Sequence, residues 1–417
     1  MQGKGLGRVM FTFRPGVRLV IVTGLSAADA NATKSAVLLG GPIGLGHEMM
    51  ARCLAGLLEQ SGWQVRRLDS MSLLGRWGGA IGARVFNRLI SVPFVYDGFH
   101  FAHLRAGSGL ANRLDRSSNA RLVPALLAEL DREPADLVVS VFASGASAAA
   151  GLKAELPRLR TVVLCTDVAV HRIWAADGTD LFLVTSAAAA ESVRRFVPRA
   201  LVAVVPPPVR PEFYAAPSRE QARAVLGVPA SGFCVLVIDS GWGFGPLVES
   251  VAALAAAGVH VLAVAGRDRR IEGRLRDLAA ATPHVTPFGF TDRVPELMAA
   301  ADVVLALPGA NTCAEARVVG RDLLLLDVMP GHGRDNLLHE LELGRAHVCV
   351  PTAAGVTASV LALRDQAARR DDDQTAAPVP RWEPAFVGAL RQIGVDLWPG
   401  EEPDRHVADT VSQSAVV

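Results

Sequence analysis

The sequence ALPGANTCAE, at residues 306–315, is the stretch that decides the fold. The apolar run at 302–307 predicts a buried parallel strand, the Pro-Gly pair that follows breaks it, and Asn311 or Thr312 can cap a helix that begins at once. A strand, a turn and a helix in this order present free backbone N–H groups together with the positive end of the helix dipole. These groups favour an anion, such as a diphosphate, at the start of the helix.

Glu315 lies one helical turn beyond Thr312 and admits two interpretations. Its carboxylate can close a capping box at the start of the helix. It can equally accept hydrogen bonds from the hydroxyl groups of a bound sugar. The motif by itself leaves both open.

The chain has 417 residues, half of them hydrophobic, and a formal net charge of +1. It is too long for one typical core and suits two α/β domains of about 170 residues each. The near-neutral charge argues against a dedicated nucleic-acid-binding protein. Five cysteines lie far apart with no C-x-x-C pair, which suits a reducing compartment and indicates neither a disulfide framework nor a zinc site. No apolar stretch in the sequence is long enough to span a membrane.

Positive charge is concentrated between residues 50 and 121, where ten arginines face four acidic residues. This local excess is compatible with an anionic membrane surface, and a solvated arginine-rich face explains it equally. The overlapping stretch 73–110 is the most aromatic-rich part of the chain. Aromatic side chains beside arginines suit either an interfacial segment that rests on lipid headgroups or an irregular helical hairpin that covers a sheet.

Strands and helices are expected to alternate in two rounds. In the first round a strand at 36–39 enters a glycine-rich turn that ends at His47, and a helix follows. The proline-rich stretch 206–211 cannot be a helix or a central strand, and is interpreted as a linker. The predicted plan is an N-terminal extension at 1–35, α/β domains at 36–205 and 220–365, a linker at 206–219, and a tail at 366–417 with a possible crossover helix and a disordered end.

The remaining expected elements follow from apolar runs bounded by glycine, proline or serine. Helices are expected at 119–131 and near 385–394, and turns at 144–147 and 239–245. The further strands are expected at 65–69, 136–140, 162–166, 181–185, 202–205, 235–238, 259–265, near 285, and at 323–327, and a strand candidate also lies at 17–23.

Six motifs occur in order between residues 36 and 352: GLGH at 44–47, TD at 166–167 with His171 and Trp174, PVRPEF at 208–213, SGWG at 240–243 with Gly245, GANTCAE at 309–315, and PGHGRDN at 330–336. Together they resemble the GT-B glycosyltransferases. More narrowly, they resemble the family 28-like branch of monogalactosyldiacylglycerol synthase and the processive diacylglycerol glucosyltransferases. The resemblance implies an α/β fold of two Rossmann-like domains that face a cleft, the first binding the acceptor and the second binding a UDP-sugar.

The resemblance also implies where the donor binds. The uracil would lie near residues 290–291, the ribose on the acidic residue of the fifth motif, the diphosphate against N–H groups of the fourth and fifth motifs, and the sugar on the sixth. An arginine of the linker motif can add a bond to a phosphate, or it forms a salt bridge within the linker; the asparagine of the sixth motif can instead cap a helix. The implied donor-binding residues are Arg210, Ser240, Gly241, Phe290, Thr291, Gly309, Ala310, Asn311, Thr312, Glu315, His332, Asp335 and Asn336.

His47 is the candidate catalytic base. It follows a glycine turn at the start of a helix, where the positive end of the dipole disfavours the imidazolium form and leaves the ring able to accept a proton. A capping or surface role is the alternative. Asp167 can orient the base or the acceptor, or cap a turn, and His171 is the rival base. No D-x-D pair precedes a suitable strand end, so we predict no metal site.

The sequence and the resemblance together predict an inverting, metal-independent transfer of a hexose from a UDP-sugar to a lipid acceptor such as diacylglycerol, with no cofactor. They imply a cytoplasmic protein attached peripherally to an anionic membrane surface. The alternatives are a glycosyltransferase acting on a soluble secondary metabolite, a UDP-sugar epimerase, and a catalytically silent nucleotide-sugar-binding protein. The sequence leaves the hexose, the acceptor and the oligomeric state open.

Overall fold

Two parallel six-stranded sheets organise the computed structural model. The structure describes residues 33–41, 45–75, 102–103, 106, 108–165, 167–238, 247–328, 331–368 and 379–397. Both sheets lie within the compact unit Lys34–Val417. The strand orders are β2-β1-β3-β4-β5-β6 and β12-β11-β10-β7-β8-β9, which are doubly wound α/β arrangements. Ligands of such sheets bind at the carboxyl ends of the strands, so those ends position the site.

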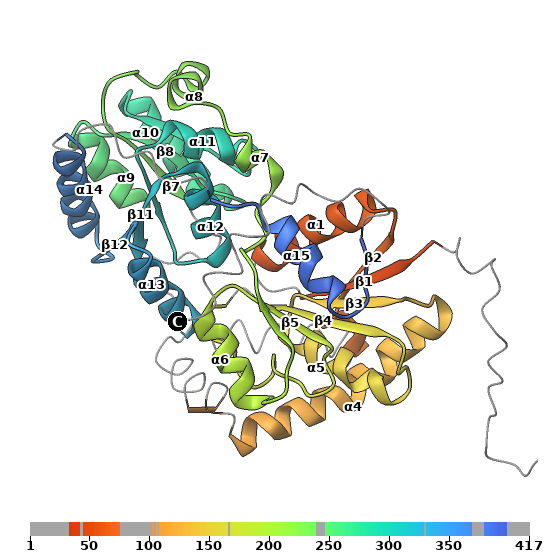
Figure 1. The fold of residues 1–417 in the computed structure, drawn as a ribbon. Coiled ribbons are helices and arrows are strands. Elements are labelled where there is room, and N and C mark those ends of the chain that lie inside the picture. Colours follow the sequence, from red (N-terminus) through yellow and green to blue (C-terminus); the bar gives the residue numbers. More distant parts are fainter. Residues whose placement is uncertain are drawn as a thin grey trace, which may run out of the picture. The chain divides into compact units, whose positions relative to one another are not determined.

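The first sheet has helices on both faces (Figure 1). Helix α1 (Leu45–Gln60) packs on one face of the sheet. The other face is covered by α4 (Gly109–Arg132), α5 (Ala143–Gly151) and α6 (Ala187–Phe196). Strands covered on both faces must be apolar throughout, and β3 and β5 are buried at every position. The strands are β1 (Ser35–Gly40), β2 (Gln64–Asp69), β3 (Leu137–Ser140), β4 (Arg160–Cys165), β5 (Leu181–Val184) and β6 (Val202–Val204).

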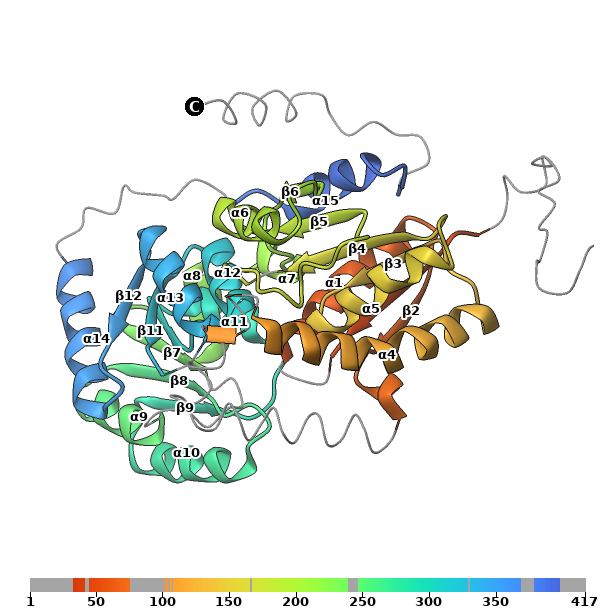
Figure 2. The ribbon, with the colours of Figure 1, turned by 90° about the horizontal axis from the view of Figure 1, so that it is seen from below.

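The second sheet repeats this plan (Figure 1, Figure 2). Helices α9 (Leu247–Ala256), α10 (Arg269–Ala281) and α14 (Ala353–Ala367) cover one face. The other face is covered by α8 (Arg219–Leu226), α11 (Val294–Ala300), α12 (Ala310–Val319) and α13 (His332–Glu342). Its strands are β7 (Cys234–Ile238), β8 (His260–Val264), β9 (Val285–Phe288), β10 (Val303–Ala306), β11 (Asp322–Leu326) and β12 (Ala346–Cys349).

A late helix returns to the first sheet. Helix α15 (Trp382–Arg391) lies beyond the second sheet in sequence, but its buried Trp382 and Phe386 share a hydrophobic cluster with Leu38 of β1. The Trp382 indole Nε1 also donates to the Val209 carbonyl at 3.0 Å. This helix therefore completes the core of the first sheet, the arrangement expected of a crossover helix.

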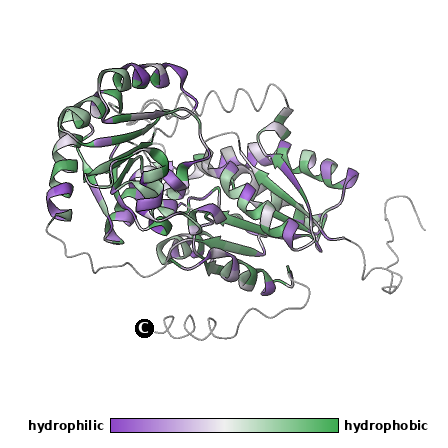
Figure 3. Cartoon of the chain, turned by 90° about the horizontal axis from the view of Figure 1, so that it is seen from above, coloured by the Kyte–Doolittle hydropathy of each residue, from purple (hydrophilic) through white to green (hydrophobic). Residues whose placement is uncertain are grey.

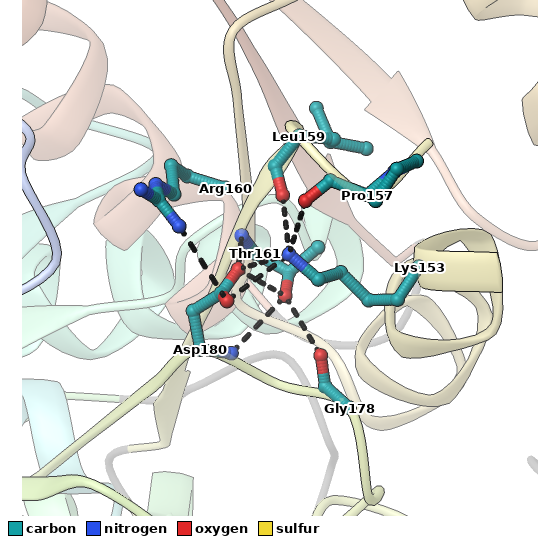
Figure 4. A network of polar contacts seen from close by, with 7 residues as sticks. All are labelled: Lys153, Pro157, Leu159, Arg160, Thr161, Gly178 and Asp180. Carbon is teal, nitrogen blue, oxygen red and sulfur yellow. Dashed lines mark hydrogen bonds and ion pairs between the residues drawn. The ribbon is translucent and has the colours of Figure 1, made fainter. Parts of the chain in front are cut away.

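Aspartates fasten the amino ends of neighbouring strands. Asp136, Asp180 and Asp302 each stand one residue before a strand, and their carboxylates accept the backbone N–H of Ser35, Thr161 and Cys234. Figure 4 shows the Asp180 cluster. There the Lys153 ammonium lies 2.9 and 3.0 Å from the two carboxylate oxygens and also donates to the carbonyls of Leu159 and Pro157. The Lys153 ammonium and the Asp180 carboxylate are thus paired with each other at this edge of the first sheet.

The expected strands that fall on described residues are confirmed within two residues at each end. No strand was predicted at β12. Helix α4 begins at Gly109, ten residues before the predicted start, because its first turns carry no regular apolar stripe. The serine-rich turn predicted at 144–147 is wrong, since these residues lie inside α5, where all of them except the half-buried Ser144 are buried. The expected strand at 17–23 and most of the aromatic stretch 73–110 lie outside the described residues.

One prediction about a helix start is also wrong, and the prediction that 206–211 is not helical holds only for 206–210. Gly309, not Asn311 or Thr312, is the N-cap of α12, and no side chain caps this helix. The proline-rich linker ends in a short helix, α7 (Pro211–Tyr214), with its proline at the first helical position, where the missing N–H costs nothing.

Hydropathy follows the layers. Figure 3 shows hydrophobic strands in both sheets and helices that carry both hydrophobic and hydrophilic residues. Among the described helices, none combines the length and the apolar character that crossing a membrane requires.

Candidate active site

The first turns of α1 and α12 meet, although they belong to different sheets. The Asn311 side-chain Nδ2 donates to the Gly46 carbonyl at 2.8 Å. A Cβ on Gly46 would lie 3.2 Å from the same nitrogen, so the approach suits a residue without a side chain. Each helix follows a strand, β1 or β10, at its carboxyl end. The two ligand-binding edges of the fold therefore face each other here.

Asn336 on α13 makes a second link between the sheets. Its Oδ1 accepts the backbone N–H of Val168 at 3.3 Å, and its Nδ2 donates to the Pro308 carbonyl at 3.2 Å. The side chain is buried, 3% exposed. The amide predicted to bind the donor sugar is thus engaged with the loops that follow β4 and β10.

His47 lies in the first turn of α1 against aromatic rings. The centroid of its ring is 5.1 Å from that of Phe142 in an edge-on arrangement and 6.4 Å from that of Trp174. Its Nδ1 is buried and makes no hydrogen bond within the described residues. A Cβ on Gly41 would lie 2.5 Å from the Phe142 ring, so a glycine at 41 leaves the room that this ring needs.

The electrostatics of His47 favour a neutral ring. Burial lowers the pKa of His47 below its usual 6.5, and the neighbouring His332 lowers it further. The Asp167 carboxylate and the Val141 carbonyl act in the opposite direction and raise the pKa. A neutral imidazole with a charge-stabilising carboxylate within reach is the arrangement that a general base requires.

Asp167 and His171 follow β4 at the carboxyl edge of the first sheet. Both are half-buried. The ring of Trp174 lies near both candidate bases, with its centroid 6.3 Å from that of His171 and 6.4 Å from that of His47. The structure thus brings both candidate bases to one buried tryptophan, and the Asp167 carboxylate acts electrostatically on His47.

Arg210 and Glu315 are bonded to each other. The Arg210 Nε and Nη2 both donate to Glu315 Oε1, at 3.1 and 3.0 Å. The capping-box interpretation of Glu315 is therefore wrong, because its carboxylate pairs with Arg210. The arginine, in turn, pairs with a residue of the second sheet's helix α12 and not with a residue of the linker. Burial raises the pKa of Glu315, while Arg210 lowers it.

The other predicted donor residues lie around α12, α13 and the end of β9. Phe290 is 65% exposed, and the Arg267 guanidinium lies 4.8 Å from the centre of its ring. The Thr291 hydroxyl accepts the backbone N–H of Arg293 at 3.1 Å. Gly309 is the N-cap of α12, Ala310 and Thr312 are in its first turn, and His332 and Asp335 are in the first turn of α13. Ser240 and Gly241 lie outside the described residues.

Two residues near the site were missed by the sequence analysis. Phe142 follows β3 at the carboxyl edge, and its position two residues beyond a buried strand could have identified it. Arg267 follows β8 in the same way, next to the predicted uracil site. Among the residues that the structure describes, no group of three His, Cys, Asp or Glu side chains is arranged to hold a metal ion.

Two family profiles match the chain. Residues 47–209 match the monogalactosyldiacylglycerol (MGDG) synthase family, and residues 244–349 match the glycosyltransferase family 28 C-terminal domain. The first match begins at His47 and ends at Val209, and the second contains α12 and the first turns of α13. The two profiles thus fall on the two sheets in the order of the chain.

Curated relatives are similar over part of their length. A probable chloroplastic monogalactosyldiacylglycerol synthase of Nicotiana tabacum is 31% identical over 147 residues, which cover 33% of this chain and 27% of that protein. The processive diacylglycerol beta-glucosyltransferase of Bacillus pumilus is 24% identical over 180 residues, which cover 42% of this chain and 47% of that protein. The matches therefore span less than half of each of these relatives.

The fold is also found among solved structures. MurG from Acinetobacter baumannii matches with a TM-score of 0.51 at 14% identity, over 92% of this chain and 100% of that chain. At this identity the match concerns the fold alone. That fold is the GT-B arrangement of two Rossmann-like domains.

Proposed function

Because this chain carries both domains of the family 28-like GT-B glycosyltransferases, we propose that it transfers a hexose from a UDP-sugar to a lipid acceptor such as diacylglycerol. The observation that carries the proposal is the position of His47. A half-buried histidine whose pKa is lowered by burial stands where the first turns of α1 and α12 meet. A base at that point can serve an acceptor held by one domain and a donor held by the other.

The donor side of the proposal rests on α12. Its first N–H groups have no side-chain cap, and they stand at the positive end of the helix dipole. They are suited to the diphosphate of the leaving UDP, with Glu315 available for the ribose hydroxyls and α13 for the sugar. No further cofactor enters the proposal, and the helix dipole supplies the charge stabilisation for which other transferases use a metal.

The proposed reaction is a direct displacement. His47 accepts the proton of the acceptor hydroxyl while the oxygen forms a bond to the anomeric carbon, and the bond from that carbon to the diphosphate breaks. The electron pair of that bond leaves with UDP, and the configuration of the carbon is inverted. Asp167 stabilises the imidazolium that forms, consistent with its raising the pKa of His47.

The lipid acceptor and the membrane surface are supported by two observations. The relatives named above are synthases or transferases of diacylglycerol glycolipids. The chain also concentrates arginines between residues 50 and 121, within the domain that would bind the acceptor. An anionic cytoplasmic leaflet attracts such a segment, so we place the protein at the cytoplasmic membrane surface as a peripheral enzyme.

The test is UDP release by the purified protein. UDP-glucose, UDP-galactose and UDP-N-acetylglucosamine are each supplied with vesicles that contain or lack diacylglycerol. We expect release with one sugar only when diacylglycerol is present, and the glycolipid product confirms transfer. The control pair is His47→Gln, which we expect to abolish release, and His347→Gln on β12, which we expect to leave it unchanged.

Other outcomes would point elsewhere. Conversion of the UDP-sugar to another UDP-sugar without any acceptor would contradict the proposal and indicate an epimerase. Transfer to water-soluble hydroxyl compounds but not to diacylglycerol would replace the lipid acceptor. UDP binding without turnover, in the wild type and in His47→Gln alike, would indicate a catalytically silent protein.

A further inference from the structure

A cavity lies at the amino edge of the second sheet, the edge opposite to the candidate active site. Its volume is about 260 Å³. It is lined by residues that precede or begin β7, β10 and β11, together with the start of α8 and the end of α14. The charged residues of its lining are Arg219, Arg321, Arg345, Asp302 and Asp322. We call it the amino-edge pocket.

One buried arginine behind the pocket has a structural role. Arg223, on α8, is 1% exposed and donates to the carbonyls of Ala300, Pro229, Ala230 and Gly232 as well as to Asp302. Asp302 in turn accepts the backbone N–H of Cys234 at 2.7 Å and pairs with Arg219 at 2.5 Å. The carboxylate of Asp302 is therefore already shared among three donors.

The second carboxylate of the pocket is also engaged. Arg345 lies 3.0 Å from Asp322, and its Nη2 donates to the Gly320 carbonyl. Gly320 is the C-cap of α12, so this arginine also stands at the negative end of the helix dipole.

Arg321 is the arginine of this lining that pairs with neither aspartate in the described residues. In the described part of the chain its side chain makes no hydrogen bond and no ion pair, and its Nε is buried. The Nε of Arg219 is buried without a partner in the same way. A buried N–H group without an acceptor costs free energy, so such a group in a native protein usually has a partner such as an ion or a water molecule.

The balance of charge points in the same direction. Arg219, Arg321 and Arg345 line the pocket with Arg223 behind them, against two aspartates of the lining and the exposed Glu220, whose pKa Arg219 and Arg321 lower. Burial lowers the pKa of Arg321, the Asp302 carboxylate raises it, and the other three arginines lower it further. By contrast, the Lys153 of the corresponding edge of the first sheet has carboxylate and carbonyl acceptors (Figure 4). The cation at that edge of the first sheet thus has acceptors, whereas the buried Arg321 Nε has none among the described residues.

We propose that the amino-edge pocket binds a phosphate group, with Arg321 as its main ligand and Arg219 and Arg345 beside it. Planar guanidinium groups match phosphate oxygens in pairs, and several arginines in one concave site are typical of phosphate recognition. The volume is slightly below the roughly 300 Å³ at which small-molecule pockets begin, which suits a phosphate group and a short attached portion. The phosphate can belong to a soluble compound or to a lipid headgroup, since the guanidinium groups contact only its oxygens.

The first experiment is calorimetric titration of the full chain with inorganic phosphate, at an ionic strength held constant with chloride. We expect wild type and Arg274→Gln, an exposed α10 arginine paired with Glu249, to bind phosphate alike. Arg321→Gln is expected to bind at least tenfold more weakly, and Arg321→Lys to fall between because it keeps the charge but not the planar fork. Without phosphate, Arg321→Gln is expected to melt at the same temperature as wild type or higher, because a half-buried cation without a bonded partner in the described residues has been removed.

A second arm identifies the source of the phosphate. The same proteins are mixed with phosphatidylcholine vesicles that contain or lack a lipid with a terminal phosphate. Sedimentation that requires both this lipid and Arg321 assigns the pocket to a headgroup, and titration without sedimentation assigns it to a soluble phosphate compound. Equal phosphate binding by wild type and Arg321→Gln would overturn the proposal, because the phosphate would then lie elsewhere. Phosphate binding no stronger than chloride binding would also overturn it. A large loss of thermal stability in Arg321→Gln would also overturn it, by showing that Arg321 is structural.

Discussion

Arg210 and Glu315 are 105 positions apart in sequence, yet both donor nitrogens of the arginine lie within 3.1 Å of one oxygen of the glutamate. The pair joins the interdomain linker to α12, in the motif that would hold the nucleotide. It is only partly exposed, 25% for the arginine and 11% for the glutamate. Because burial raises the pKa of Glu315 and Arg210 lowers it, the arginine keeps this carboxylate available as an acceptor.

The first prediction concerns Glu315→Gln. We expect UDP to bind about 10- to 100-fold more weakly, because the loss of a charge-assisted hydrogen bond to a ribose hydroxyl costs about 1.5–3 kcal/mol of binding free energy. The free energy of unfolding should change by no more than about 1 kcal/mol, because the partly exposed Arg210 can turn to solvent. Titration calorimetry and urea unfolding measure the two quantities. Unchanged UDP affinity would show that the glutamate serves only the ion pair.

The second prediction concerns the pH dependence of His47. Because its pKa is lowered from 6.5, the ring is neutral at pH 7, and the acid limb of the pH profile of kcat/KM should lie below 6.5. The folded state holds the neutral ring, whereas the unfolded chain takes up a proton as the pH falls through 6.5. This histidine's contribution to stability is therefore present above pH 6.5 and is lost as the pH falls from there to the lowered pKa. Unfolding free energies of wild type and His47→Gln, measured from pH 8 to 5, should show this loss only in wild type.

The third prediction compares the two candidate bases. We expect His47→Ala to lower kcat about 10²- to 10⁴-fold while the affinity for UDP stays within about twofold, because a general base acts in the transition state. His171→Ala is expected to have a much smaller effect on kcat. Steady-state rates and UDP titration decide the matter. The reverse order of effects would transfer the role of base to His171.

The fourth prediction concerns Asn336→Ala. Removing the amide leaves the Val168 N–H and the Pro308 carbonyl without their partner, which we expect to cost about 1–3 kcal/mol of unfolding free energy. Hydrogen exchange at the Val168 amide should accelerate, because its acceptor is gone. Asn112→Ala on α4, whose side chain makes no hydrogen bond in the described residues, is the control and should stay within about 0.5 kcal/mol. Exchange at Val168 as slow as in wild type would contradict the link between the sheets.

The fifth prediction concerns the amino edge of the first sheet. Asp180→Ala removes the carboxylate that pairs with Lys153 and accepts the Thr161 N–H, and we expect a loss of about 2–4 kcal/mol in stability. The exposed Asp177 is a matched control, and Asp177→Ala should stay within about 0.5 kcal/mol. Urea unfolding of both variants measures the difference. Equal stability of the two variants would show that the Asp180 cluster contributes little.

The sequence by itself determined the order of strands and helices and which residues follow each strand. Apolar runs, prolines and glycines act over a few neighbouring residues, so the positions of His47, Asp167 and Asn311 at carboxyl edges could be predicted. The local signal failed where it was weak. The first turns of α4 carry no apolar stripe, and the serines of α5 resemble a turn because their burial depends on a sheet elsewhere in the chain.

Only the tertiary structure decided which of these residues meet. Asn311 reaches Gly46 across 265 positions and Asn336 reaches Val168 across 168, and no local pattern records either contact. The same holds for Arg321, whose neighbours in the amino-edge pocket come from separate strands and helices. Pairing and burial depend on which segments pack together, and that is fixed by the hydrophobic cores of both sheets rather than by the residues on either side of a motif.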